Sequence, residues 1–158
     1  MSTPFTKIYD AFFARITDDM YMEWTKEDTE KDCKNILLAA IPGFEFPRFA
    51  LYDYDADAEV YNVDLTSEEI NIFAYLMMME WVQRQVTTIE NTRMKYTGVD
   101  YKMTSQANHL DKLMKLKNET ERIDRHYQRL YRRHKINDDG TISSNWSVLI
   151  EKSALDGN

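Results

Sequence analysis

Three aspartates at alternate positions form the stretch of this 158-residue sequence that most resembles a chemical site. Asp53, Asp55 and Asp57 match the first three ligand positions of an EF-hand calcium loop. The match then fails, because Ala58 stands where the sharp turn requires glycine and Asp64 stands where a bidentate glutamate closes the site. We therefore interpret the segment as a turn whose carboxylates stay in water, and we predict no metal ion there.

Residue types that carry out catalysis are present but do not form a recognisable pattern. His126 and His134 lie eight residues apart with no further metal ligand at helical spacing, and His109 is isolated. At helical spacing Cys33 shares one face with Ile36, Leu37 and Ala40, which is typical of a small core side chain. The sequence contains no nucleophile elbow, phosphate-binding loop or dinucleotide motif. We therefore expect neither an enzyme nor a cofactor.

Arginines gather near the end of the chain, interleaved with aromatic side chains. They are Arg122, Arg125, Arg129, Arg132 and Arg133. A basic strip with aromatic residues is typical of a nucleic-acid surface. The chain as a whole is acidic, with a formal net charge of −7, and opposite charges also favour contact between proteins. Both interpretations stay open, and we favour a protein contact.

The charges are separated along the sequence. Residues 1–65 carry 14 acidic and 6 basic side chains, whereas residues 105–135 carry 4 acidic and 9 basic ones. Such asymmetry serves nucleic-acid binding, and it equally suits a subunit that packs head-to-tail against copies of itself.

The composition predicts a folded, mainly α-helical protein. The chain is 43% hydrophobic and 13% aromatic, and it contains only 4 Gly and 3 Pro. The single Cys33 excludes an internal disulfide, and we find neither a signal peptide nor an apolar run long enough to span a membrane. We therefore expect a soluble protein made in a reducing cytoplasm.

The first third of the chain predicts two helices. Thr3 is suited to cap a helix with Pro4 at its first position, and an apolar stripe then runs to Ile16. A second helix is expected to begin after Thr25 and to end at Pro42. Residues 44–64 change to alternating aromatic and β-branched residues, which indicates a small β-hairpin.

Two long helices are predicted next, joined by about eight residues and packed as an antiparallel pair. The first begins with a capping box from Thr66 to Glu69 and extends towards Met94. The second begins at Thr104 or Ser105 and ends near His134. Its expected apolar face comprises Ala107, Leu110, Met114, Ile123, Tyr127, Leu130 and Tyr131.

A turn is predicted at residues 137–140, where the sequence reads Asn-Asp-Asp-Gly. We therefore expect a helical bundle domain at 1–136, and a turn followed by a C-terminal arm at 137–158.

Two segments together resemble a known family. The run MEWVQRQVTTIENTRMKYTGVDYKMTSQANHLDKLMKL and the arginine-rich QRLYRRHK are similar to small structural proteins of tailed bacteriophages of Gram-positive hosts. The N-terminal MSTPFTKIYDAFFARITDDMYMEWTKEDTEKD and the central IPGFEFPRFALYDYD fit the same pattern. The resemblance covers most of the chain and contains no catalytic motif. It points to head–tail connector proteins, also called adaptor or neck proteins.

This resemblance implies a mostly helical subunit that forms a ring, commonly of twelve copies, beneath the portal of the DNA-filled capsid. The long helices would form the body of the ring, and the stopper or tail protein would bind its other side. The arm would reach the portal through Trp146, Leu149 and Ile150. Genomic DNA would pass through the ring without sequence-specific binding. The protein would be assembled in the host cytoplasm and reside in the virion, with no contact to a membrane.

The alternative is a small helical nucleic-acid-binding or regulatory protein that uses the arginine strip. The candidate partner-binding residues are Arg125, Arg129, Arg132, Arg133, Trp146, Leu149 and Ile150.

Overall fold

The computed structural model describes residues 2–16, 20–95, 100–137 and 142–144. The helices are α1 (Phe5–Phe13), α2 (Met20–Glu23), α3 (Lys26–Ala40), the 3-10 helix η1 (Ile41–Gly43), α4 (Ser67–Lys95) and α5 (Asp100–Arg133). The strands are β1 (Thr3–Pro4), β2 (Tyr54–Asp55), β3 (Val60–Tyr61), β4 (His134–Ile136) and β5 (Ile142–Ser144). The predicted mainly α fold is confirmed.

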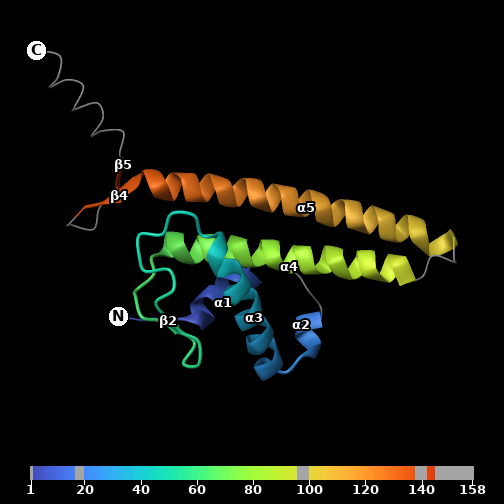
Figure 1. Ribbon diagram of the computed structural model, residues 1–158, viewed down its shortest axis with the longest axis horizontal. Coiled ribbons are helices and arrows are strands. Elements are labelled where there is room, and N and C mark those ends of the chain that lie inside the picture. The colour runs from blue at the N-terminus through green and yellow to red at the C-terminus, as the bar shows by residue number, and fades with distance from the viewer. Residues whose placement is uncertain (1, 17–19, 96–99, 138–141, 145–158) are drawn as a thin grey trace, which may run out of the picture.

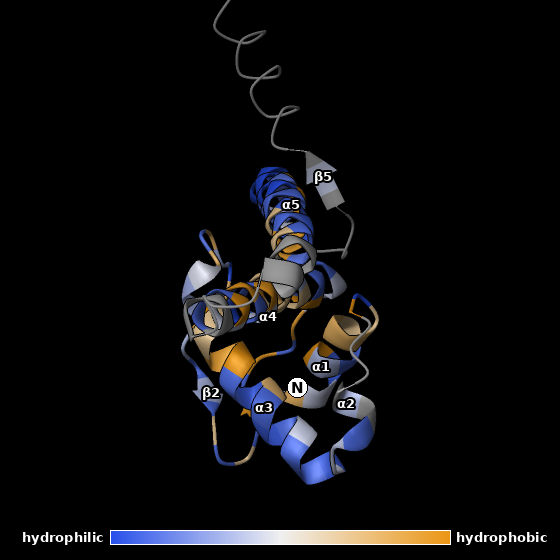
Figure 2. Ribbon diagram, turned by 90° about the vertical axis from the view of Figure 1, so that its right-hand side faces the viewer, coloured by the Kyte–Doolittle hydropathy of each residue, from blue (hydrophilic) through white to orange (hydrophobic). Residues whose placement is uncertain are grey.

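The helices form layers, with α4 in the middle (Figure 1). Helices α4 and α5 run antiparallel along most of their length, as the sequence predicted. Helices α1 and α3 pack against the other side of α4 (Figure 2). At one end, the α4–α5 pair extends beyond α1 and α3, so that part of the pair is not covered by these two helices (Figure 1).

The hydrophobic core is centred on α4. Phe73, Met77 and Val82 of this helix are fully buried, and they belong to one cluster with Phe12 of α1 and Leu37 of α3. Burial on several sides explains why α4 has no clear amphipathic pattern, because much of the helix meets α5 on one side and α1 or α3 on the other.

The start of α4 confirms the predicted capping box. The Glu69 backbone N–H donates to the Thr66 hydroxyl (3.3 Å), and the Thr66 N–H donates to the Glu69 carboxylate (2.7 Å). The predicted cap of α3 is also confirmed, since the Asp28 N–H donates to the Thr25 hydroxyl at 3.2 Å.

Thr3 does not cap α1, so that prediction was wrong. Pro4 takes the cap position without a side-chain hydrogen bond, and Thr3 lies in β1, where its buried hydroxyl accepts the Leu65 N–H at 2.8 Å. Strand formation with Tyr61 therefore competes successfully with local capping.

The hairpin expected over residues 44–64 is much smaller than predicted. Strands β2 and β3 pair antiparallel over two residues each, and β1 adds to the other edge of β3 to give the order β1-β3-β2. Residues 44–53 contain bends and turns instead of a strand. Pro47 has no N–H to donate, and Phe44 and Phe49 pack individually against Phe73.

The aspartate-rich segment is a turn, in agreement with the sequence interpretation. We call residues 52–59 the acidic turn. One carboxylate oxygen of Asp55 accepts the backbone N–H groups of Asp57 and Ala58, both at 2.9 Å, and Glu59 adopts a positive φ of 53°. Asp53 accepts a hydrogen bond from the Asn62 side chain at 2.7 Å. These contacts fix the shape of the turn.

Helix α5 begins at Asp100, one turn earlier than predicted, so Thr104 and Ser105 lie inside it and do not cap it. No proline or glycine interrupts residues 99–105, and the weak capping signal did not stop the helix. Only residues 96–99 separate α4 from α5. Strand β4 follows α5 directly and pairs with β5, and the predicted turn at residues 137–140 lies outside the described ranges from residue 138 on.

Candidate functional site

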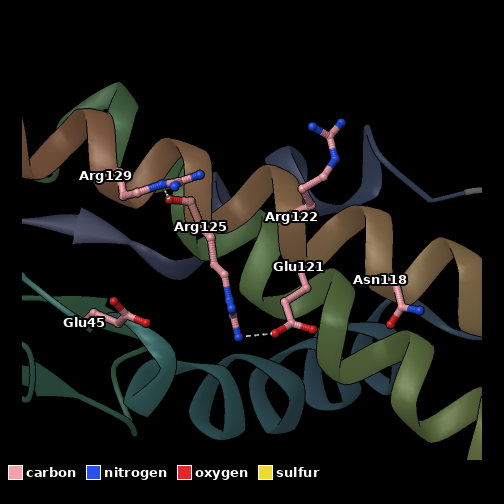
Figure 3. A pocket seen from close by; sticks show the side chains of 6 residues that line it. All are labelled: Glu45, Asn118, Glu121, Arg122, Arg125 and Arg129. Carbon is pink, nitrogen blue, oxygen red and sulfur yellow. Dashed lines mark hydrogen bonds and ion pairs between the residues drawn. The ribbon is translucent and has the colours of Figure 1, made fainter.

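The candidate site is the solvent side of the C-terminal half of α5. Arg122, Arg125 and Arg129 line a groove of about 750 Å³ with Asn118, Glu121 and Glu45 (Figure 3). Helical spacing puts residues 118, 122, 125 and 129 on one face of α5, and Glu45 comes from the loop after η1. We call this surface, together with the adjoining Arg132 and Phe46, the arginine face.

Two arginines of this face form ion pairs with acidic residues of the same helix. Arg125 binds Glu121, and Arg122 binds Glu119 through two nitrogens at 3.0 and 2.6 Å. The contact with Arg122 holds the pKa of Glu119 below its usual value. All four side chains are exposed, so these pairs contribute little to stability and leave the guanidinium groups open to a partner.

The remaining arginines are held differently. Arg129 donates to the Arg125 carbonyl at 3.1 Å. The Arg132 guanidinium lies 4.4 Å from the centre of the Phe46 ring, and Phe46 itself is 46% exposed. Arg133 is exposed at the end of α5. The structure therefore gathers Arg125, Arg129 and Arg132 on one surface with an aromatic ring that sequence analysis did not select.

The opposite side of α5 is buried, and its polar side chains hold the loop that completes the face. Gln128 is 5% exposed; its amide nitrogen donates to the Gly43 carbonyl (3.1 Å), and its amide oxygen accepts the Glu45 N–H (2.8 Å). A Cβ at Gly43 would lie only 2.8 Å from Leu76 Cδ2, so glycine lets η1 lie directly against α4. The backbone of Glu45 is thereby fixed beside the groove.

Asp124 lies one turn before Gln128 and is 2% exposed. One carboxylate oxygen accepts a hydrogen bond from Gln128 at 2.7 Å, and the other has no partner among the described residues. Burial raises the pKa of Asp124 to about 6, an effect that Glu45 strengthens and the Gln128 hydrogen bond weakens.

A second buried network closes the end of α5. The Tyr131 hydroxyl donates to Glu69 of α4 (2.6 Å) and accepts the Arg48 N–H (3.1 Å). The Arg48 guanidinium lies 4.1 Å from the centre of the Tyr131 ring and donates to the Tyr131 and His134 carbonyls. His134 pairs with Glu68 at 2.8 Å. The last turn of α5 is thus fixed to both α4 and the loop after η1.

The predicted apolar face of α5 is wrong at several positions. Met114 is 50% exposed, and Tyr127 is 38% exposed and stacks on Tyr75. Tyr131 is buried as predicted, and the other buried side chains in the described part of α5 are Leu113, Thr120, Asp124 and Gln128. These follow helical spacing as regularly as the predicted face does. A search for helical spacing that accepts polar residues as well as apolar ones would have found Thr120, Asp124 and Gln128.

The three remaining candidates, Trp146, Leu149 and Ile150, lie outside the described residues. Within the described ranges, no group of three or more His, Cys, Asp or Glu side chains is placed to hold a metal ion. In the same part of the chain, each helix is too short or too polar to span a lipid bilayer.

Comparison with known proteins gives no family for this chain. No protein-family model matches it, and neither a curated protein nor a solved structure does. The arrangement of charges and exposed side chains is therefore the basis on which a function can be argued.

Proposed function

We propose that this chain is a structural subunit of the head–tail connector of a tailed bacteriophage. In this proposal, copies of the chain form a ring, commonly of twelve, between the portal and the stopper or tail protein. Genomic DNA passes through the ring without sequence-specific binding. The chain has no catalytic activity or cofactor in this role. It is assembled in the host cytoplasm and resides in the virion.

The observation that carries the proposal is the separation of charge in the folded chain. The arginine face lies on α5 at one side of the molecule, and the acidic turn projects from the opposite side (Figure 1). A subunit with complementary surfaces on opposite sides is suited to bind copies of itself in a closed ring. The similarity of residues 79–116 and 128–135 to connector proteins supports the same role.

The long helix pair is a second support. Helices α4 and α5 span 29 and 34 residues, and they form the longest dimension of the molecule (Figure 1). Paired helices of this length resist bending better than loops, which suits the wall of a ring that bears load. Residues 142–158 follow at one end of this pair and, in the proposal, bind the portal through Trp146, Leu149 and Ile150.

A nucleic-acid-binding role for the arginine face is the alternative. Exposed Arg129 and Arg133 favour it. However, Glu45 and Glu121 line the same groove, and carboxylates at this position repel a phosphate backbone. Mixed charge is more typical of a surface that binds protein.

The test is to fractionate a lysate of the producing cells on a density gradient and to detect the chain with an antibody. The proposal expects it to sediment with DNA-filled particles. Recovery in the soluble fraction alone would contradict the connector role and favour the alternative.

A truncated chain that ends at residue 144 provides the matched comparison, because it keeps every described residue and lacks Trp146, Leu149 and Ile150, the proposed contacts of the arm. We expect it to remain soluble and to be lost from the particle fraction. For the nucleic-acid alternative, the expected result is DNA binding that weakens steeply with salt and that is lost in Arg129→Glu.

A further inference from the structure

We propose that the acidic turn of one copy docks on the arginine face of a second copy, so that copies join head-to-tail. The inference rests on the proposed function, which requires copies to contact one another, and it assigns that contact to two named surfaces. Its occupant is a second copy of this chain because the chain itself carries the complementary charge.

The arginine face has the features of a protein-binding centre. Phe46 is 46% exposed beneath the Arg132 guanidinium, and the groove next to it is lined by Arg125 and Arg129. Arginine and aromatic side chains contribute most of the binding energy at protein interfaces. The backbone of this surface is already fixed, since Gln128 holds the Glu45 N–H, so little order has to be gained on binding.

The acidic turn presents the complementary features. Tyr52 is 67% exposed, and Asp53 and Asp57 beside it are exposed as well. The hydrogen bonds that Asp55 accepts within the turn fix its shape before any partner binds. In the proposed contact, Tyr52 and the carboxylates of the acidic turn would therefore face Phe46 and the guanidinium groups of the arginine face.

The edges of the two surfaces also match in charge. Lys34 lies 3.6 Å from Glu59 at the base of the turn and supplies a cation there. Glu45 and Glu121 supply carboxylates within the arginine face. Because each surface carries both signs of charge, one orientation of the contact pairs opposite charges, whereas other orientations bring like charges together.

The two surfaces cannot meet within one molecule. Helix α5 forms one outer layer, whereas the segment between β2 and β3 lies at the opposite edge, beyond α4 (Figure 1). A contact between them therefore joins two copies and leaves one surface of each kind free, so that it can repeat, and it gives a ring where the rotation between copies closes.

The test uses charge exchange in the full chain. One variant, Arg125→Glu/Arg129→Glu, reverses the face, and the other, Asp53→Lys/Asp57→Lys, reverses the turn. Sedimentation velocity should show association of the natural chain at about 0.1 M salt and its loss at about 1 M, where the Debye length falls to about 3 Å. Each variant alone should associate about a hundredfold more weakly, because like charges then face each other. An equimolar mixture of the two should associate again.

The mixture is the decisive arm, since it restores opposite charges at every contact although neither variant carries both natural surfaces. Lys112→Glu/Lys115→Glu makes the same charge change on α5 outside the face and should associate like the natural chain. Circular dichroism establishes that each variant is folded. A natural chain that stays monomeric at about 1 mM and low salt, or variants whose mixture stays monomeric, would overturn the proposal.

Gradient fractionation separates this failure from failure of the connector role. If the chain is found in particles but the charge-exchange mixture does not associate, the connector role stands and the copies contact one another through other surfaces. A chain that associates as expected but is absent from particles has the head-to-tail contact without the connector role.

Discussion

The two long helices of this protein lie side by side but are held in place by different interactions. Helix α4 buries apolar side chains on several sides, including Phe73, Met77 and Val82. Helix α5 buries Thr120, Asp124 and Gln128 against the rest of the molecule. Apolar burial depends on area and tolerates small shifts, whereas hydrogen bonds require fixed positions. Helix α4 therefore supplies most of the stability, and α5 supplies the alignment of the loop that carries Glu45 and Phe46.

The largest effect is expected from a cavity in α4. Met77→Ala should lower the free energy of unfolding by about 2–5 kcal/mol, because Met77 is fully buried in the core. Met79→Ala, two residues along the same helix at a partly buried position, is the matched control and should cost clearly less. Urea denaturation followed by circular dichroism measures both. Equal losses would contradict the structure, because they would mean that Met77 and Met79 are buried to the same extent.

A smaller effect is expected where α5 is attached by hydrogen bonds. Gln128→Leu should destabilise the protein by about 3 kcal/mol, since it leaves the Glu45 N–H, the Gly43 carbonyl and Asp124 without their partner. Hydrogen exchange should accelerate at Glu45 in particular.

Gln83→Leu is the matched control for this change. Gln83 also links α4 to α5, through Lys117, but in an exposed position, and its replacement should change stability by less than about 0.5 kcal/mol. If both substitutions had the same small effect, the buried polar contacts of α5 would not fix the loop.

The pH dependence of stability tests the same polar face. The pKa of Asp124 is about 6 when folded, above the ordinary value of 3.8, so the folded state holds its proton more tightly. The contribution of Asp124 to stability is then greatest below about pH 4, falls as the pH rises to about 6, and is level above that, with a total loss of about 3 kcal/mol.

Asp124→Asn should remove this pH dependence and leave the variant more stable than the natural chain at pH 7 by about the same amount. Asp111→Asn, at an exposed carboxylate on the same helix, should leave the profile unchanged. Thermal melts at several pH values give both curves. A natural chain whose stability rises between about pH 4 and 6 would show that other carboxylates outweigh Asp124.

The smallest expected effect tests whether α4 and α5 are energetically coupled. Glu69 uses one carboxylate oxygen to cap α4 at Thr66 and the other to accept the Tyr131 hydroxyl of α5. Thr66→Ala removes the hydroxyl that accepts the Glu69 N–H, and Tyr131→Phe removes the donor to the Glu69 carboxylate; each should cost about 1 kcal/mol. Because they share Glu69, the double variant should deviate from the sum by about 0.5 kcal/mol or more, and additive losses would show that the helices are independent.

Local signals in the sequence predicted the fold well where they act within a few residues. The capping box at Thr66, the helix start at Thr25, the antiparallel pair and the burial of Cys33 were all correct. Thr3 was misassigned because its hydroxyl is used by Leu65, 62 residues away, and no local pattern contains that information.

The candidate site was predicted only in part, because some of its residues are brought together by contacts between distant parts of the chain. Arg125, Arg129 and Arg132 were selected from their spacing, and they do share one face with the groove. Glu45 and Phe46 were missed, since they reach α5 only through the loop that Gln128 holds. The buried side of α5 was misjudged because apolar residues were expected to mark it. Tyr127 stacks at the surface instead, while Asp124 takes the interior.

Arg48 has a mechanical consequence for the end of the chain. It donates to the carbonyl of Tyr131 in the last turn of α5 and to that of His134, the first residue of β4, and so places a positive charge near the negative end of the helix dipole. Together with the pair between His134 and Glu68, this fastens the segment before the C-terminal residues to the first turn of α4. Tension applied to the C-terminus would therefore pass across the molecule into α4 and the core instead of peeling α5 away from its end.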